Sequence, residues 1–120
     1  MDKRPKTIFC DIDGTLVIHE KPAVNSRLDH TMALISGTLE KLGHWDRLGY
    51  RIILTTGRKE SMRAATEKQL SECGIFYDQL IMGIGGGKRV LINDRKPYGS
   101  DDYALAININ RNIGIGDIDI

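Results

Sequence analysis

Two aspartates separated by a single residue follow a short apolar run near the start of the chain. The run, residues 7–10, predicts a buried strand, and Asp11 and Asp13 come directly after it. Alternate residues of an extended chain point to the same side, and Gly14 lets the backbone turn sharply after them. Such a pair suits a hard divalent cation, and it allows one acid to act as a nucleophile and the other as a general acid and base. A solvated Asp-Gly turn without a function is the alternative.

The elements that must position these acids follow from the alternation of apolar patterns along the chain. Residues 36–48 and 61–73 carry apolar side chains at helical spacing. Five runs are typical of strands, namely residues 7–10, 51–55, 79–82, 90–92 and 104–109. Strands separated by helices pair in parallel through right-handed crossovers. The sequence therefore predicts one α/β domain over residues 1–120, with a doubly wound, Rossmann-like parallel sheet flanked by helices. Ligands of such a sheet bind at the carboxyl ends of its strands. The tail, residues 111–120, is either an edge strand or a frayed terminus.

The acidic turn resembles motif I of the haloacid dehalogenase (HAD) superfamily, in its phosphatase branch. The run Phe-Cys-Asp-Ile-Asp-Gly-Thr-Leu, residues 9–16, matches the family pattern Asp-x-Asp-Gly-Thr at every specified position. The resemblance implies that Asp11 takes a phosphoryl group as an aspartyl phosphate. It also implies that Asp13 protonates the leaving group and then activates the hydrolytic water. Dehalogenase members lack the second acid, so phosphate transfer is favoured over cleavage of a carbon–halogen bond.

Attack of a carboxylate on a phosphate ester requires a metal ion, a fixed cation and hydrogen-bond donors. At ~4 Å and an effective dielectric constant near 20, each pair of like charges costs on the order of 4 kcal/mol. Thr56 and Gly57 follow the predicted strand 51–55 and are similar to HAD motif II. The Thr56 hydroxyl and the N–H groups at the start of the next helix are expected to bind a phosphate oxygen. Arg58 either contacts the substrate or lies on a solvated helix start.

A glycine-rich loop, Gly-Ile-Gly-Gly-Gly-Lys-Arg, occupies residues 83–89. It does not match a phosphate-binding P-loop, which has four residues between its glycines and Ser or Thr after the lysine. Its position in the chain corresponds to HAD motif III, and the resemblance implies that Lys88 is the cation beside the phosphate and Asp11. Arg89 is the alternative for this role.

The apolar run 90–92 is followed by Asn93 and Asp94, and this segment resembles HAD motif IV. The resemblance implies that Asp94 completes a Mg²⁺ shell with Asp11 and Asp13, the latter through its backbone carbonyl. Many members of the family carry a second acid at this motif, which this chain lacks. The candidates for supporting the metal in its place are Asn93, Asp101 and Asp102.

The short intervals between the motifs leave no room for a cap domain. Neither 15–55 nor 57–87 exceeds what the predicted helices and strands need, and only residues 16–24 could form a flap hairpin. In this respect the chain looks most like small capless phosphatases such as the 3-deoxy-octulosonate 8-phosphate phosphatases. A capless site is open, so we expect a small phosphorylated metabolite such as a sugar phosphate as substrate, in a homo-oligomer whose subunits close the site.

Composition narrows the choice of partners and location. Seventeen Lys and Arg face sixteen Asp and Glu, and this balance argues against nucleic acid as a partner. No apolar run approaches the ~20 residues of a membrane span, so no membrane partner is expected. Cys10 and Cys73 have no metal-ligand spacing and suit a reducing compartment, so we expect a cytoplasmic protein.

The sequence thus predicts a Mg²⁺-dependent phosphomonoester hydrolase. Two alternatives remain. A phosphotransferase or mutase would use the same residues to pass the phosphoryl group to a hydroxyl. A phosphate-binding module would have no catalytic activity.

Overall fold

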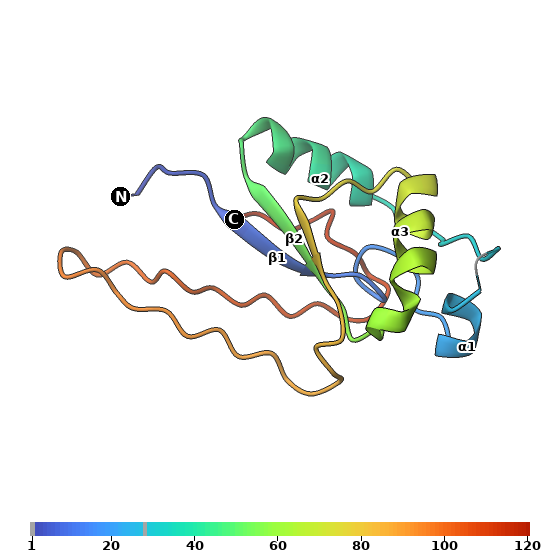
Figure 1. Ribbon diagram of the computed structural model, residues 1–120. Coiled ribbons are helices and arrows are strands. Elements are labelled where there is room, and N and C mark those ends of the chain that lie inside the picture. The colour runs from blue at the N-terminus through green and yellow to red at the C-terminus, as the bar shows by residue number, and fades with distance from the viewer. Residues whose placement is uncertain (1, 28) are drawn as a thin grey trace.

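A parallel sheet of three strands lies at the centre of the chain (Figure 1). The computed structural model describes residues 2–27 and 29–120. Along the chain the elements are β1 (Thr7–Asp11), α1 (Pro22–Asn25), α2 (Thr38–Arg47), β2 (Arg51–Thr55), the 3₁₀ helix η1 (Glu60–Met62), α3 (Arg63–Glu72) and β3 (Gln79–Ile81). The three strands and the two longer helices confirm the corresponding sequence predictions, and the fold is a Rossmann-like α/β arrangement.

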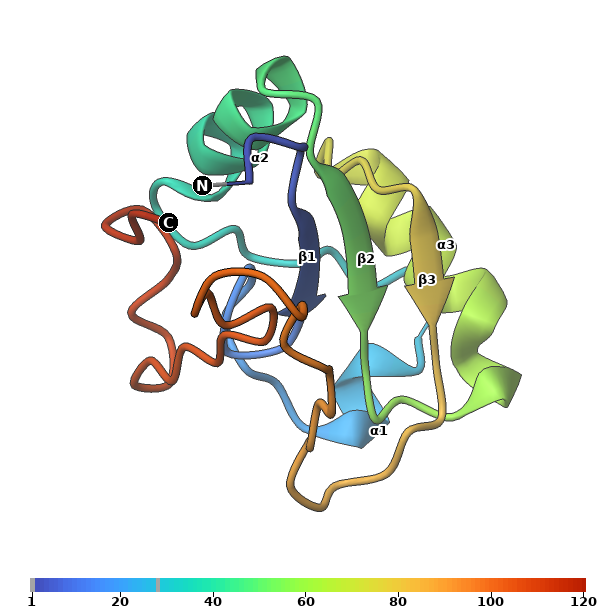
Figure 2. The ribbon, with the colours of Figure 1, turned by 90° about the vertical axis from the view of Figure 1, so that its left-hand side faces the viewer.

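The strands are ordered β1-β2-β3, and their register brings their carboxyl ends to one edge of the sheet (Figure 2). Asp11 is paired with Thr55, and Thr55 is paired with Ile81. The segments that leave the three strands therefore begin side by side. This edge is where the sequence places its acids and hydroxyls.

The core lies between the sheet and the helices. Its strand residues come from alternate positions of β1 and β2, as expected for a sheet with one covered face: Ile8, Cys10, Ile52 and Leu54. The helices contribute Leu42 and Trp45 from α2 and Leu70 from α3. Full burial of each such side chain contributes about 1.5–3 kcal/mol. On the other face of β1, Phe9 remains 54% exposed.

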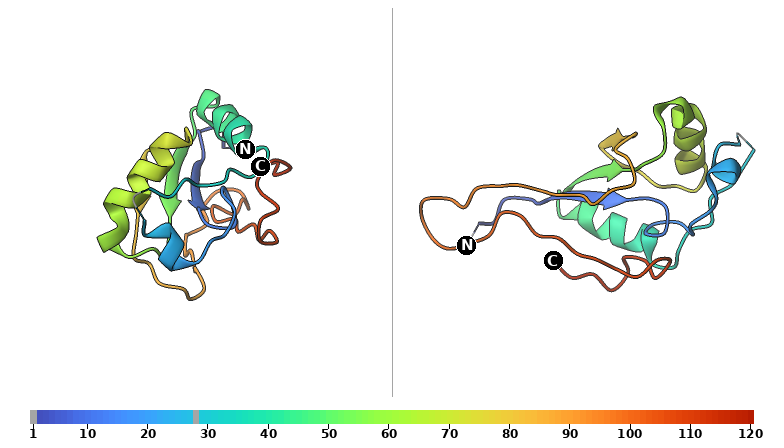
Figure 3. Two further views of the ribbon diagram at one scale, coloured as in Figure 1. Left: turned by 90° about the vertical axis from the view of Figure 1, so that its right-hand side faces the viewer. Right: turned by 90° about the horizontal axis from the view of Figure 1, so that it is seen from below.

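Residues 88–109 form a long excursion, called the arm below, which leaves the sheet edge and returns to it (Figure 3). The strands expected at 90–92 and 104–109 are wrong, because the arm belongs to no strand of the described chain, and Val90 and Ile92 are 79% and 88% exposed. Residues with β propensity form a strand only where a neighbouring strand offers packing and hydrogen-bond partners. The arm projects away from α3 and finds none, which contributes to a longest molecular dimension of 51 Å.

The flap hairpin expected over residues 16–24 is also wrong. Val17 forms single bridges with Asp13 and Leu34 instead of a hairpin ladder. The chain then enters α1, where Pro22 occupies the first helical position. Proline suits that position because its fixed φ is helical and its missing N–H would have no partner there.

The tail packs back onto the body of the protein. Ile115 is buried in the core, and Ile118 and Ile120 pack against it. The tail is therefore neither an edge strand nor a frayed terminus. No helix within the described residues is both long and apolar enough to cross a membrane.

Candidate active site

The turn after β1 is held by its own main chain. The carbonyl of Ile12 accepts hydrogen bonds from the N–H groups of Thr15, Leu16 and Val17, at 3.1, 2.9 and 3.3 Å. Gly14 has a φ of +84°, a left-handed conformation that side-chain-bearing residues rarely adopt. Ile12 and Leu16 are fully buried and anchor the turn in the core. The backbone of the turn therefore sets the positions from which the two flanking carboxylates project.

Asp11 ends β1 with its carboxylate at the surface of the sheet edge. One of its oxygens accepts a hydrogen bond from the Thr15 hydroxyl at 3.1 Å. Partial removal from water raises the pKa of Asp11, and the nearby charge of Asp13 adds to this effect. The hydrogen bond from Thr15 and the charge of Arg89 act in the opposite direction. Asp11 is the accessible carboxylate of the pair.

Asp13 is held by a buried arginine. The Arg58 guanidinium donates from Nε to Oδ2 at 2.9 Å and from Nη2 to Oδ1 at 2.8 Å. The two side chains are 5% and 17% exposed, Arg58 being the more buried. Two parallel N–H···O bonds between charged groups give a strong and directional pair. Both oxygens of Asp13 are thus engaged, in contrast to Asp11.

Arg58 has further partners on α3. Its Nη1 donates to the Thr66 hydroxyl at 3.0 Å and to Gln69 Oε1 at 2.9 Å. Both acceptors are fully buried. Arg58 therefore lies inside the protein. The expectation that it lies on a solvated helix start or contacts a substrate is wrong, because its guanidinium is bound by Asp13, Thr66 and Gln69. A lone arginine after a threonine and a glycine gives no signal for such burial.

Thr56 and Gly57 follow β2 and lie beside the glycine-rich loop that follows β3. The Thr56 hydroxyl is buried and accepts a hydrogen bond from the Arg58 N–H at 3.1 Å. A Cβ added to Gly57 would lie 2.9 Å from the Gly85 carbonyl oxygen, so the loop can pass this closely only beside glycine. Binding of phosphate by Thr56 and Gly57 remains a prediction.

A shallow pocket of about 210 Å³ opens at the acidic turn. Its lining comprises Asp11, Asp13, Gly14, Thr15, His19, Ile109 and Arg111. The last two residues come from the returning end of the arm and from the tail, which the sequence could not place. Asn112 fixes the tail there, since its N–H donates to the Gly14 carbonyl at 2.8 Å and its side-chain oxygen accepts from the His19 N–H at 2.9 Å. Arg111 thus lines the same pocket as the two carboxylates, and nothing in its sequence context indicates this.

The structure distinguishes the two cations of the glycine-rich loop. Arg89 lies close enough to Asp11 for its charge to lower the pKa of that carboxyl group. The Arg89 guanidinium also donates to the Gly87 carbonyl, within the loop itself. The role of Lys88 beside the phosphate remains a prediction, with Arg89 the better placed of the two.

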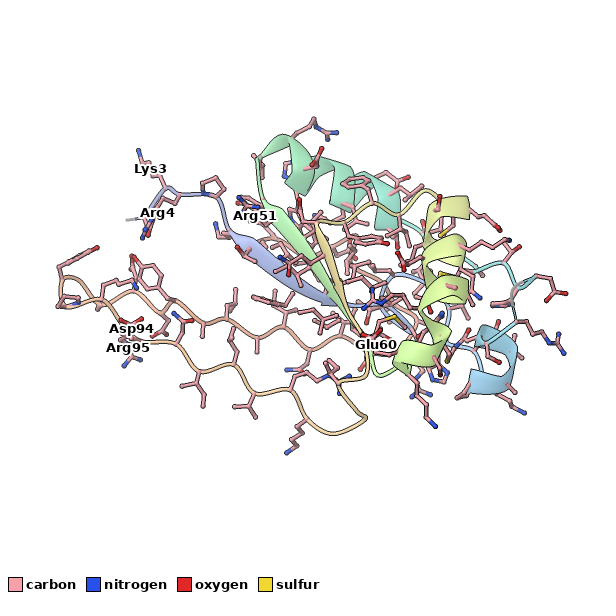
Figure 4. All side chains as sticks on the ribbon, in the orientation of Figure 1. Lys3, Arg4, Arg51, Glu60, Asp94 and Arg95 are labelled. Carbon is pink, nitrogen blue, oxygen red and sulfur yellow. The ribbon has the colours of Figure 1, made fainter. Side chains whose placement is uncertain are left out.

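Asp94 lies on the arm, far from the acidic turn. Figure 4 shows it beside Arg95 near the outer end of the arm, whereas Glu60 marks the edge where the strands end. Its carboxylate is 70% exposed and pairs with Lys96 at 3.3 Å. The structure therefore does not bring Asp94 to Asp11 and Asp13, and its role as a third metal ligand remains a prediction.

Oxygen donors at the turn fit a magnesium ion in part. Within residues 2–27 and 29–120, no three His, Cys, Asp or Glu side chains gather as a metal cluster. Asp11 offers a carboxylate, whereas the Asp13 carboxylate is held by Arg58 and leaves its main-chain carbonyl as the available donor. Mg²⁺ commonly takes one or two carboxylates and completes its shell with water and substrate phosphate. Asp11 and the Asp13 carbonyl are consistent with this preference.

Three solved proteins resemble the chain in structure. In two structures of the Pnkp1/Rnl/Hen1 RNA repair complex, the matching chain is 29% and 31% identical, with TM-scores of 0.57 and 0.55 over 72% and 65% of this chain. The chain corresponds to only 30% and 25% of the length of those proteins. A Vibrio cholerae protein of known structure is 19% identical, with a TM-score of 0.52, and 73% of this chain matches 79% of it.

The third is the D,D-heptose 1,7-bisphosphate phosphatase of B. bronchiseptica, solved with magnesium and phosphate. It is 17% identical, with a TM-score of 0.47, over 68% of this chain and 51% of that protein. No protein-family model matches the chain, and neither does the sequence of any curated protein. The fold of the chain is HAD-like, as the acidic turn predicts.

Proposed function

We propose that the chain is a phosphomonoester hydrolase in which Asp11 is the nucleophile. The observation that carries this proposal is the division between the two acids of the turn. Asp11 is accessible at a pocket, whereas Asp13 is held two residues away by a buried cation. One group is free to attack and the other is fixed in place, which is the arrangement that nucleophilic and acid–base roles require.

The proposed reaction has two steps. In the first, which starts from Asp13 in its protonated form, an Asp11 oxygen attacks the phosphorus, the ester P–O bond breaks, and Asp13 gives its proton to the leaving oxygen. In the second, Asp13 takes a proton from water, which attacks the phosphorus and releases phosphate and the Asp11 carboxylate. Arg58 holds Asp13 in position through both steps, and Arg111 offsets the negative charge at the pocket.

A Mg²⁺ ion is proposed as the cofactor. When bound, it would neutralise charge on the phosphate oxygens and reduce their repulsion of Asp11. Asp11 and the main-chain carbonyl of Asp13 would hold it. Asp94 would join them only if the arm changed its position.

The proposed substrate is a small phosphorylated metabolite, because the pocket is small and the net charge of the chain is close to zero. The similarity to a protein of an RNA repair complex favours a second candidate, the terminal phosphate of an RNA strand. The two differ in what lies beyond the phosphate, so they can be compared directly as substrates.

The test is release of inorganic phosphate with Mg²⁺ from a panel of nitrophenyl phosphate, sugar phosphates and RNA oligonucleotides with a terminal phosphate. We expect Asp11→Asn to reduce turnover of the best substrate by at least about 10³-fold. Asp46→Asn is the matched control, since Asp46 lies on α2 and lines a different pocket. Equal turnover by Asp11→Asn and Asp46→Asn would contradict the proposal.

We also propose that copies of the chain associate in the cytoplasm. Exposed apolar side chains on the arm, such as Val90 and Ile92, support association, because water-exposed apolar surface of this extent is unfavourable. The two cysteines are free, which suits a reducing compartment. Light scattering during size-exclusion chromatography tests association, and a monomer at all concentrations would contradict it.

A further inference from the structure

A chain of hydrogen bonds connects Asp13 to the C-terminal end of α1. It begins with the two hydrogen bonds from Arg58 to Asp13 and continues from Arg58 Nη1 to Gln69 Oε1 at 2.9 Å. The Gln69 side-chain amide then donates to the carbonyls of Asn25 and Arg27, at 2.8 and 3.1 Å. These contacts join four separate segments: the turn after β1, the end of α1, the residues after β2, and α3.

Gln69 is a polar residue on the buried side of α3. It is fully buried beside Leu70, where a leucine or methionine would serve packing alone. Buried polar groups are retained at low cost only when they are hydrogen-bonded. Both polar atoms of the Gln69 side chain have partners. Its oxygen accepts from Arg58 and its nitrogen donates to two main-chain carbonyls, and these contacts set the orientation of the amide.

The two partners that hold Arg58 on α3 are uncharged. Thr66 and Gln69 accept hydrogen bonds without competing for the positive charge of the guanidinium. Asp13 is therefore the acidic partner of Arg58 in the described structure. The donors of a guanidinium lie in one rigid plane. Hydrogen bonds that fix the position of Nη1 therefore also fix Nε and Nη2, the two donors that hold Asp13.

We propose that Gln69 is a positioning residue for Asp13. It orients the Arg58 Nε and Nη2 donors, and through Asn25 and Arg27 it ties the position of Asp13 to the C-terminal end of α1. The inference rests on the proposed role of Asp13 as the proton donor to the leaving group. Removal of the Gln69 amide should leave substrate binding intact and impair proton donation.

The experiment compares two esters that differ in their need for a proton. An alkyl phosphate has a poor leaving group and requires proton donation, whereas nitrophenolate leaves without it. In Gln69→Met we expect kcat for the alkyl phosphate to fall about tenfold, kcat for nitrophenyl phosphate to change by less than about twofold, and both KM values to stay within about twofold. Thr66→Val, which removes the other neutral acceptor of Arg58, should give a smaller effect of the same kind.

Thr38→Val is the matched control. Thr38 is also buried, and its hydroxyl donates to the Leu16 carbonyl at 2.8 Å without contacting Arg58. Its loss should affect both esters equally. If Gln69→Met does not fold, Thr66→Val carries the same comparison.

A second measurement does not depend on activity. The Arg58 Nε–H resonance, assigned by its loss in Arg58→Lys, should be protected from exchange in the wild type and in Thr38→Val, and should lose protection in Gln69→Met. Unchanged protection, or equal falls in kcat for the two esters, would overturn the positioning role. A wild type that hydrolyses neither ester would contradict the proposed function, and the exchange measurement would then decide the positioning of Asp13 alone.

Discussion

The acidic turn and the arm both carry acids next to residues with strand propensity, yet Asp13 of the turn is held by a segment distant in sequence, whereas Asp94 of the arm pairs locally. Asp13 is fixed by Arg58 with both oxygens engaged. Asp94 stands on an exposed segment and pairs with Lys96, two residues away. An acid is therefore positioned by contacts with distant segments, and the local sequence pattern around it does not suffice.

The largest difference between the two regions is expected from their arginines. Arg58→Met removes the partner of Asp13 and of two buried acceptors, and should lower the free energy of unfolding by about 3 kcal/mol or more. Arg95→Met breaks an exposed ion pair with Asp102 and should change the free energy of unfolding by less than about 0.5 kcal/mol. Urea denaturation of both variants measures the difference. Equal losses would show that Arg58 is not enclosed as described.

The next difference concerns apolar side chains. Leu54→Ala removes a fully buried side chain of β2 and should cost about 2–5 kcal/mol, because it leaves a cavity in the core. Ile92→Ala acts on a side chain that is 88% exposed and should cost less than about 0.5 kcal/mol. Thermal and urea unfolding decide between these values. A large loss in Ile92→Ala would mean that the arm is packed against a partner.

The smallest effect concerns the cysteine next to Asp11. Burial raises the pKa of the Cys10 thiol from 9.0 to about 12, so at pH 8 only about one molecule in 10⁴ carries the reactive thiolate. The folded state therefore binds this proton more tightly than the unfolded state. The resulting contribution to the free energy of unfolding is present below pH 9 and is lost as the pH rises towards 12.

Half-buried Cys73 should react before Cys10 with a thiol reagent in the native protein. Faster labelling of Cys10 would contradict the burial of β1.

The sequence predicted what depends on local pattern. The strand ending at Asp11, the turn at Gly14 and the helices at 38–47 and 63–72 follow from apolar spacing and glycine placement. In a parallel sheet these patterns also determine which ends meet. Asp11, Asp13 and Thr56 could therefore be assigned to one edge before the structure was known.

What the sequence could not predict depends on partners distant in the chain. The contacts of Arg58 with Asp13 and Gln69 join segments whose spacing carries no periodic signal. Arg111 reaches the pocket because the tail folds back, and a Gly- and Ile-rich tail has several possible packings. The arm was expected to form strands because β propensity describes a residue's preference and does not state whether a neighbouring strand is present.

Detection of a phosphoryl group on Asp11 tests most directly whether Asp11 is the nucleophile. The wild type is mixed with Mg²⁺ and its best phosphate ester, quenched in acid during turnover, digested and analysed by mass spectrometry. We expect one added phosphoryl group on the peptide that contains Asp11, and none on that peptide in Asp11→Asn. Steady turnover with the phosphoryl group on another residue, or with none on the Asp11 peptide, would contradict it.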